Sequence, residues 1–76
     1  MLTEEQVIAA IRIHGGVDSD KLIGLDDDFK TLNIDSLEVF VVLLKIEAIT
    51  GTKIPDDNVA AMTTGRAILD YCNSKT

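Results

Sequence analysis

Hydrophobic residues recur along most of this chain at the three- and four-residue spacing of α-helices, and no two segments alternate as paired strands do. The first helix is predicted to begin at Thr3, because the segment TEEQ at residues 3–6 has the form of a capping box. Gly15 and Gly16 are expected to end it. The apolar positions between these signals are Val7, Ile8, Ala10 and Ile11. This spacing predicts a helix with one buried face.

The next helical pattern begins only after a long, acid-rich connection, residues 17–34. A connection of that length is unusual in so short a chain unless something holds it in place. Leu25, Phe29 and Leu32 are the large apolar residues along it that can do so. We therefore expect these three side chains to pin the connection to the core.

A second helix is predicted over residues 36–50, where Gly51 ends it, and its pattern is apolar on nearly every side. One broad face consists of Val39, Val42, Leu43, Ile46 and Ile49. A stripe on the opposite side, with Phe40 at its edge, consists of Leu37, Val41, Leu44 and Ala48. So short a chain cannot easily surround such a helix. We expect this apolar stripe to face a partner, a second copy or a lipid-like cargo; the alternative is that residues 17–34 cover it.

Two further helices complete the pattern. Pro55 is placed to start a short third helix over residues 56–61. Thr63 or Thr64 is expected to cap a fourth, since both precede a helical run. The apolar positions of that run are Ala67, Ile68, Leu69, Tyr71 and Cys72. The predicted fold is all-α: a small four-helix bundle with a short third helix and a long loop between helices one and two.

The charge balance narrows the choice of partners. Thirteen acidic and seven basic residues give a net charge of −6. Such a surface repels nucleic-acid phosphates and anionic lipid headgroups, and it favours proteins with basic patches. No apolar run approaches the ~20 residues of a membrane span, and the single Cys72 cannot form an internal disulfide. We expect a monomeric, cytoplasmic protein that binds no nucleic acid and does not insert stably into membranes.

Ser36 is the candidate for chemistry, because it stands at the predicted start of the second helix. Asp35 and Glu38 can cap that helix without it, which would leave Ser36 an ordinary first-turn residue. A catalytic serine is disfavoured, because the chain has no G-x-S-x-G elbow and only one histidine, His14. A third interpretation is modification, because the free N–H groups and the dipole of a helix N-terminus tolerate a phosphate ester. Asp35 and Glu38 would then frame the serine for a basic enzyme.

No metal site and no catalytic site are predicted. The acidic run at residues 26–28 does not form a D-x-D-x-D-G loop, and consecutive acids do not converge on one ion, so these side chains are expected to be solvated. His14 lies near the end of the first helix, where a positive charge suits the helix dipole. The sequence contains no constellation from which an intrinsic enzyme could be built.

Three motifs together resemble the acyl carrier protein family over nearly the whole chain. The first is Phe29-x-x-Leu32-x-x-Asp35-Ser36-Leu37, which resembles the attachment motif of that family. The second is Ile54-Pro55-Asp56, and the third is Thr63-Thr64 followed by Ala67, Asp70 and Tyr71. The resemblance implies that residues 1–76 form a single carrier-protein domain. It also implies the fold predicted above.

The resemblance further implies that Ser36 receives 4′-phosphopantetheine covalently from coenzyme A, through a magnesium-dependent phosphopantetheinyl transferase. A member of the family catalyses nothing; it carries acyl intermediates as thioesters to acyl-transferring and acyl-modifying enzymes of fatty-acid, polyketide or similar pathways. The predicted partner-binding residues are Asp35, Leu37, Glu38, Val41, Leu44 and Ala48. The residues predicted to lie near an acyl pocket are Val42, Ile46, Ile54, Val59 and Met62. For any single one of them, ordinary core packing is the simpler interpretation.

The chain departs from the family pattern on the second helix. Val41 and Ala48 stand where housekeeping fatty-acid carriers have acids, and Lys45 adds a positive charge. Asn33 replaces the usual loop glycine, although asparagine also tolerates a left-handed backbone. These differences favour a specialised carrier for a dedicated pathway. The alternative is a small helical interaction module that uses the apolar face of the second helix without a prosthetic group.

Overall fold

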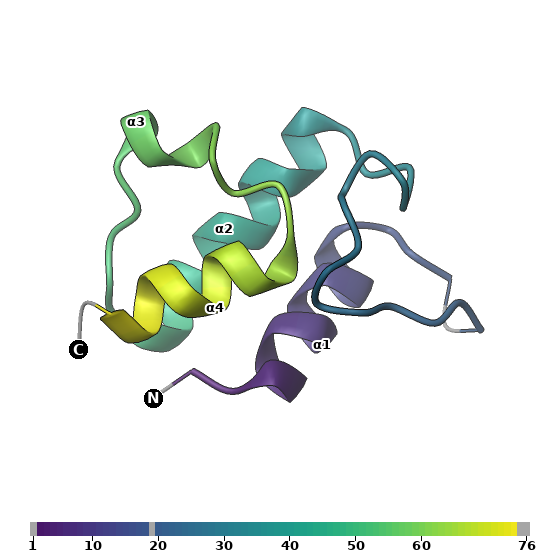
Figure 1. Cartoon of the computed structure of the whole chain (residues 1–76), viewed down its shortest axis with the longest axis horizontal. Coiled ribbons are helices and arrows are strands. Elements are labelled where there is room, and N and C mark those ends of the chain that lie inside the picture. Colours follow the sequence, from purple (N-terminus) through teal and green to yellow (C-terminus); the bar gives the residue numbers. More distant parts are fainter. Residues whose placement is uncertain (1, 19, 75–76) are drawn as a thin grey trace.

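The computed structural model describes residues 2–18 and 20–74, and it shows an all-helical fold (Figure 1). The four helices are α1 (Glu4–His14), α2 (Ser36–Thr50), α3 (Asp56–Val59) and α4 (Gly65–Ser74). α1 packs against both α2 and α4, and the long connection between α1 and α2 runs along one side of the molecule (Figure 1). The predicted bundle with a short third helix and a long first loop is confirmed. No helix in the described part is long and apolar enough to cross a membrane.

α1 begins at the predicted capping box and ends at the predicted pair of glycines. The Thr3 hydroxyl accepts a hydrogen bond from the Gln6 backbone N–H at 3.2 Å, and the Gln6 side-chain oxygen accepts one from the Thr3 N–H at 2.9 Å. The helix ends at His14, after which Gly15 caps it and Gly16 adopts a positive φ of 69°. The capping box and the glycine stop are both confirmed.

α2 begins and ends where the sequence predicts. The Asp35 carboxylate accepts a hydrogen bond from the Glu38 N–H at 2.8 Å, and the Glu38 carboxylate accepts one from the Asp35 N–H at 3.2 Å. At the other end, Gly51 takes a left-handed conformation with φ of 72°. The two hydrogen bonds between Asp35 and Glu38 satisfy the helix start without using the side chain of Ser36.

The connection between α1 and α2 is pinned by more side chains than expected. Leu25, Phe29 and Leu32 are buried, as predicted. Further buried residues of the connection, which the sequence analysis did not single out, are Val17, Ile23 and Ile34. Asn33 has φ of 60°, so it adopts the left-handed conformation that asparagine tolerates. The connection is therefore a packed segment of the fold.

Polar contacts from α1 and from the segment before α4 hold this connection. The Arg12 guanidinium donates to the carbonyl oxygens of Asp18 at 2.8 Å and Lys21 at 2.9 Å. The Phe29 N–H donates to the Thr63 carbonyl at 2.9 Å. The bond between Phe29 and Thr63 joins positions more than thirty residues apart in the sequence. Together with the bonds from Arg12, it fixes the path of the connection over the bundle.

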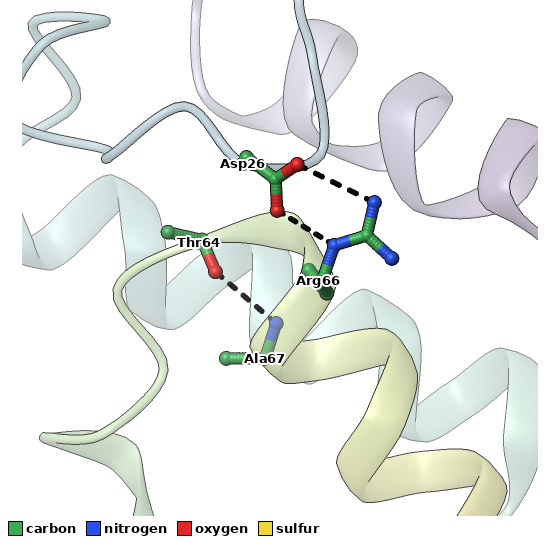
Figure 2. Close-up of polar contacts among 4 residues, drawn as sticks. All are labelled: Asp26, Thr64, Arg66 and Ala67. Carbon is green, nitrogen blue, oxygen red and sulfur yellow. Dashed lines mark hydrogen bonds and ion pairs between the residues drawn. The ribbon is translucent and has the colours of Figure 1, made fainter.

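An ion pair at the start of α4 adds a further link (Figure 2). The Arg66 Nε donates to the Asp26 carboxylate at 2.6 Å, and this hydrogen bond is the main cause of a lowered pKa at Asp26. Any stability from the pair is present above the ordinary pKa of 3.8 and is lost as the pH falls through the lower folded value. The prediction that these acids are solvated is confirmed at Asp26, whose side chain is 78% exposed although it pairs with Arg66. Both partners are largely exposed, so the contribution is small.

The last two helices differ slightly from the prediction. Thr64, and not Thr63, caps α4: its hydroxyl accepts the Ala67 N–H at 3.1 Å (Figure 2). The predicted α3 over 56–61 is too long, because α3 ends at Val59. The Met62 N–H donates to the Val59 carbonyl, three residues back, and this tight turn places the Met62 side chain in the core at 5% exposure. Burial of Met62 thus ends the helix early.

The centre of the core comes from three of the helices. Its most deeply buried side chains are Val7, Ile11, Val42, Ile46, Ile68 and Cys72. Gly65 lets α4 approach α1 closely, because a Cβ there would lie 3.1–3.2 Å from the side chains of Val7, Ile11 and Leu25. Ile49 shares the broad apolar face of α2 with Val42, Leu43 and Ile46 but lies outside the core. Ile49 is 42% exposed, because the helix and loop packing around α2 covers only part of its circumference.

Candidate functional site

Ser36 is the first residue of α2, and its side chain is exposed. Its neighbours Asp35 and Glu38 already satisfy the backbone N–H groups of the cap. The Ser36 hydroxyl makes no hydrogen bond to any residue in the described part of the chain. The fold therefore presents a primary hydroxyl at a fixed helix terminus and leaves it uncommitted.

A cleft of about 250 Å³ lies beside Ser36, between the start of α2 and the α3 region. Its apolar lining residues are Phe29, Ile34, Val39, Val59, Ala60 and Met62. Its polar lining residues are Asp28, Lys30, Ser36 and Thr63. The uncommitted hydroxyl thus borders a mainly apolar cleft, which suits a group that joins a polar attachment point to a hydrocarbon.

The predicted acyl-pocket residues divide into two groups. Val59 and Met62 line the cleft beside Ser36. Val42, Ile46 and Ile54 are at most 7% exposed and lie in the core, outside the cleft lining. Sequence reasoning missed four apolar lining residues, namely Phe29, Ile34, Val39 and Ala60. The only sequence signal for the first three was that they lie within seven residues of Ser36.

The apolar stripe of α2 is exposed along its whole length. Leu37 is 71% exposed, Leu44 49% and Val41 40%, and Ala48 is also exposed. Phe40, at the edge of the stripe, is 44% exposed. The alternative that residues 17–34 cover the stripe was wrong, because those residues pack beside α1 and the segment before α4. A continuous exposed apolar surface therefore begins next to Ser36.

His14 does not belong to the site. It lines a separate groove between α1 and α2 and is not among the residues lining the cleft at Ser36. Within residues 2–18 and 20–74, no three His, Cys, Asp or Glu side chains are placed to hold a metal ion together. The site thus consists of a hydroxyl, an acidic helix start and an apolar cleft.

Seven acidic side chains lie along the connection between α1 and α2 and at the starts of α2 and α3. They are Asp26, Asp27, Asp28, Asp35, Glu38, Asp56 and Asp57. Because the chain carries a net charge of −6, we expect magnesium or salt to raise the melting temperature by screening this repulsion. Thermal unfolding followed by circular dichroism, from low to moderate salt at neutral pH, checks this. A flat or falling melting temperature would contradict it.

Comparison with known proteins decides the family. The family model described as "Phosphopantetheine attachment site" matches residues 7–72, which is most of the chain. The chain belongs to the acyl carrier protein family. It is also 30% identical over 71 residues to the acyl carrier protein of Thermosynechococcus vestitus, an alignment that covers 93% of this chain and 88% of that relative.

Membership confirms the predicted cofactor class, because the matched family is defined by phosphopantetheine attachment. Acyl carrier proteins are carriers and not catalysts, which agrees with a site that contains a hydroxyl and an apolar cleft. The residues present in this carrier fit the group: the Ser36 hydroxyl is free and exposed, and an apolar cleft adjoins it. Membership favours a carrier over an interaction module without a prosthetic group.

Proposed function

We propose that Ser36 is the residue that bears 4′-phosphopantetheine, and that this carrier serves a dedicated acyl pathway of the fatty-acid, polyketide or similar type. The observation that carries the proposal is the placement of Ser36. Its hydroxyl is exposed, has no hydrogen-bond partner in the described residues and borders the apolar cleft. When bound, the group supplies a thiol on which acyl chains are carried as thioesters.

The residues around Ser36 hold the attachment point and offer shelter to cargo. Asp35 and Glu38 fix the first turn of α2 through their reciprocal hydrogen bonds, so the backbone of Ser36 is held at the helix start. Val59 and Met62 offer apolar surface to a hydrocarbon, and each CH₂ removed from water is worth ~0.8 kcal/mol. The cleft, at about 250 Å³, is smaller than typical pockets for whole ligands. We infer that it holds the part of a chain nearest the arm.

The proposal of a dedicated pathway rests on the surface of α2. Leu37, Val41 and Leu44 expose apolar side chains along α2, so a basic enzyme patch would find no carboxylate on this stripe. A partner that docks here must bury apolar area to bind. This favours enzymes with an apolar docking surface, together with a phosphopantetheinyl transferase that recognises the acidic pair Asp35 and Glu38.

Counting reactive thiols tests the attachment proposal. Cys72 is 1% exposed, and burial is the main cause of the raised pKa of its thiol, so it should react slowly with thiol reagents in the folded protein. The apo protein should therefore show no fast-reacting thiol at neutral pH. After incubation with coenzyme A, magnesium and a broad-specificity phosphopantetheinyl transferase, one fast-reacting thiol should appear.

The Cys72→Ala variant is the matched control, because its only thiol is the one that the transferase adds. It should give one reactive thiol after loading, in both the native and the denatured protein, whereas denatured wild type should give two. Absence of a new thiol in both proteins would contradict the proposal. A fast thiol in the folded apo protein would show instead that Cys72 is accessible.

A further inference from the structure

A second groove, of about 170 Å³, lies between α1 and α2 on residues that the cleft at Ser36 does not use. From α1 it is lined by Gln6, Ala9, Ala10, Ile13 and His14, and from α2 by Lys45 and Ile49. We call it the α1/α2 groove. α2 contributes to it from its second half, since Lys45 lies nine residues beyond Ser36, roughly 13 Å along the helix. The two depressions are therefore separate.

The walls of the α1/α2 groove are apolar and open to solvent. Ile13 is 72% exposed and Ile49 is 42% exposed, so a large aliphatic side chain from each helix borders it without cover. Ala9 and Ala10 also line the groove, and their side chains are too short to fill the depression. Exposed apolar residues that gather around a groove, in contrast to single ones scattered over a surface, mark an interaction site.

The charge of this groove is opposite to that of the protein. No acidic residue lines it, and Lys45 supplies a positive charge, while the whole chain carries −6. The residues three and four positions from Lys45 on α2 are Val41, Val42, Ala48 and Ile49, all apolar, so no helical neighbour neutralises it. Its ammonium forms no ion pair with the described residues. His14 adds an imidazole that can hydrogen-bond a carboxylate.

We propose that the α1/α2 groove is a docking site for a helix of a partner protein that presents an apolar anchor flanked by acidic residues. The groove is too small for a whole small-molecule ligand, which occupies roughly 300–1,000 Å³, but it can accept a side chain or two. A carboxylate beside that anchor would meet Lys45. A second copy docked groove to groove is disfavoured, because Lys45 would then meet Lys45 and no acidic residue lines the groove.

This docking site is independent of the attachment proposal, because the α1/α2 groove and the cleft at Ser36 share no lining residue. A partner held on the α1/α2 groove leaves the Ser36 end of α2 open to acyl-handling enzymes. In these two proposals, α2 has two functions. Its first turn presents the attachment point between acidic residues that suit a basic enzyme. Its second half binds an acidic partner.

A pair of synthetic helical peptides tests this proposal on the phosphopantetheine-loaded protein. One carries leucines at positions i, i+3, i+4 and i+7 flanked by glutamates, and the other is identical except for lysines in place of the glutamates. Affinity is measured by fluorescence anisotropy, and the binding surface by amide chemical-shift changes. The acidic peptide should bind roughly tenfold or more tightly than the basic one. Its shifts should concentrate at Ala9, Ile13, Lys45 and Ile49.

Ile13→Glu and Lys45→Glu should each weaken the acidic peptide roughly tenfold or more. Both positions are exposed, so circular dichroism should stay unchanged. The matched control is Leu22→Glu, which places the same charge on a 91% exposed loop residue and should leave binding unchanged. Equal binding of the two peptides, no binding, or shifts confined to Leu37 and Val41 would overturn the proposal. Self-association that Ile13→Glu abolishes would assign the groove to a second copy and overturn it as well.

Discussion

Ser36→Ala is expected to abolish transfer of phosphopantetheine while the protein keeps its helical content and melting temperature. The modification needs the hydroxyl, but folding does not, because Asp35 and Glu38 cap α2 and the Ser36 side chain is exposed. Wild type should gain one phosphopantetheine on incubation with coenzyme A and a broad-specificity transferase. The alanine variant should gain none. Intact mass measures both results.

Two matched variants separate loss of the hydroxyl from a damaged helix start. Thr31→Ala removes a nearby exposed hydroxyl and should load like wild type. Asp35→Ala keeps Ser36 but removes the cap, which should cost about 0.5–2 kcal/mol of stability. Loading of the Ser36→Ala variant to the wild-type level would show that another residue bears the group.

Val41→Glu is expected to weaken the complex with the carrier's own acyl-handling enzyme by roughly 1–3 kcal/mol, because it places a carboxylate without a matched partner in an apolar contact. The same change should improve recognition by generic fatty-acid enzymes with basic docking patches. Val41 is 40% exposed, so stability should change little. Calorimetric titration of wild type and variant against each enzyme, with a melting curve for each protein, measures these effects.

The adjacent position provides a control for the face of the helix. Val42 is 1% exposed, so Val42→Glu should unfold the bundle, whereas Val41→Glu should not. Affinity of the wild type for its own enzyme should also fall only modestly between low and physiological salt, since apolar burial responds little to screening. Unchanged affinity in Val41→Glu, or a steep loss with salt in the wild type, would contradict docking through the apolar stripe.

The sequence predicts the bounds of α1 and α2 because their signals are local. Thr3 and Asp35 each bond a residue three positions ahead, and Gly51 adopts a left-handed backbone that needs no distant partner. The end of α3 was predicted poorly, because it is set by the burial of Met62 against the rest of the fold. Tertiary packing there prevails over helix propensity.

In the candidate site, too, features set by local signals could be predicted and features set by distant contacts could not. The exposed position of Ser36 could be predicted, because a capped helix start fixes it. The cleft wall could not, because Phe29 reaches it only through the path of the long connection. That path depends on distant contacts, such as the hydrogen bond from the Phe29 N–H to the Thr63 carbonyl. The pairing of Asp26 with Arg66, forty residues away, was missed for the same reason.

The most direct test of the central claim is to locate the modification within the loaded protein. Trypsin cleaves after Lys30 and Lys45, so the peptide of residues 31–45 contains Ser36 and only one other hydroxyl side chain, Thr31. Tandem mass spectrometry of that peptide should place a single phosphopantetheine on Ser36. Its presence on Thr31 or on any other tryptic peptide would contradict the assignment.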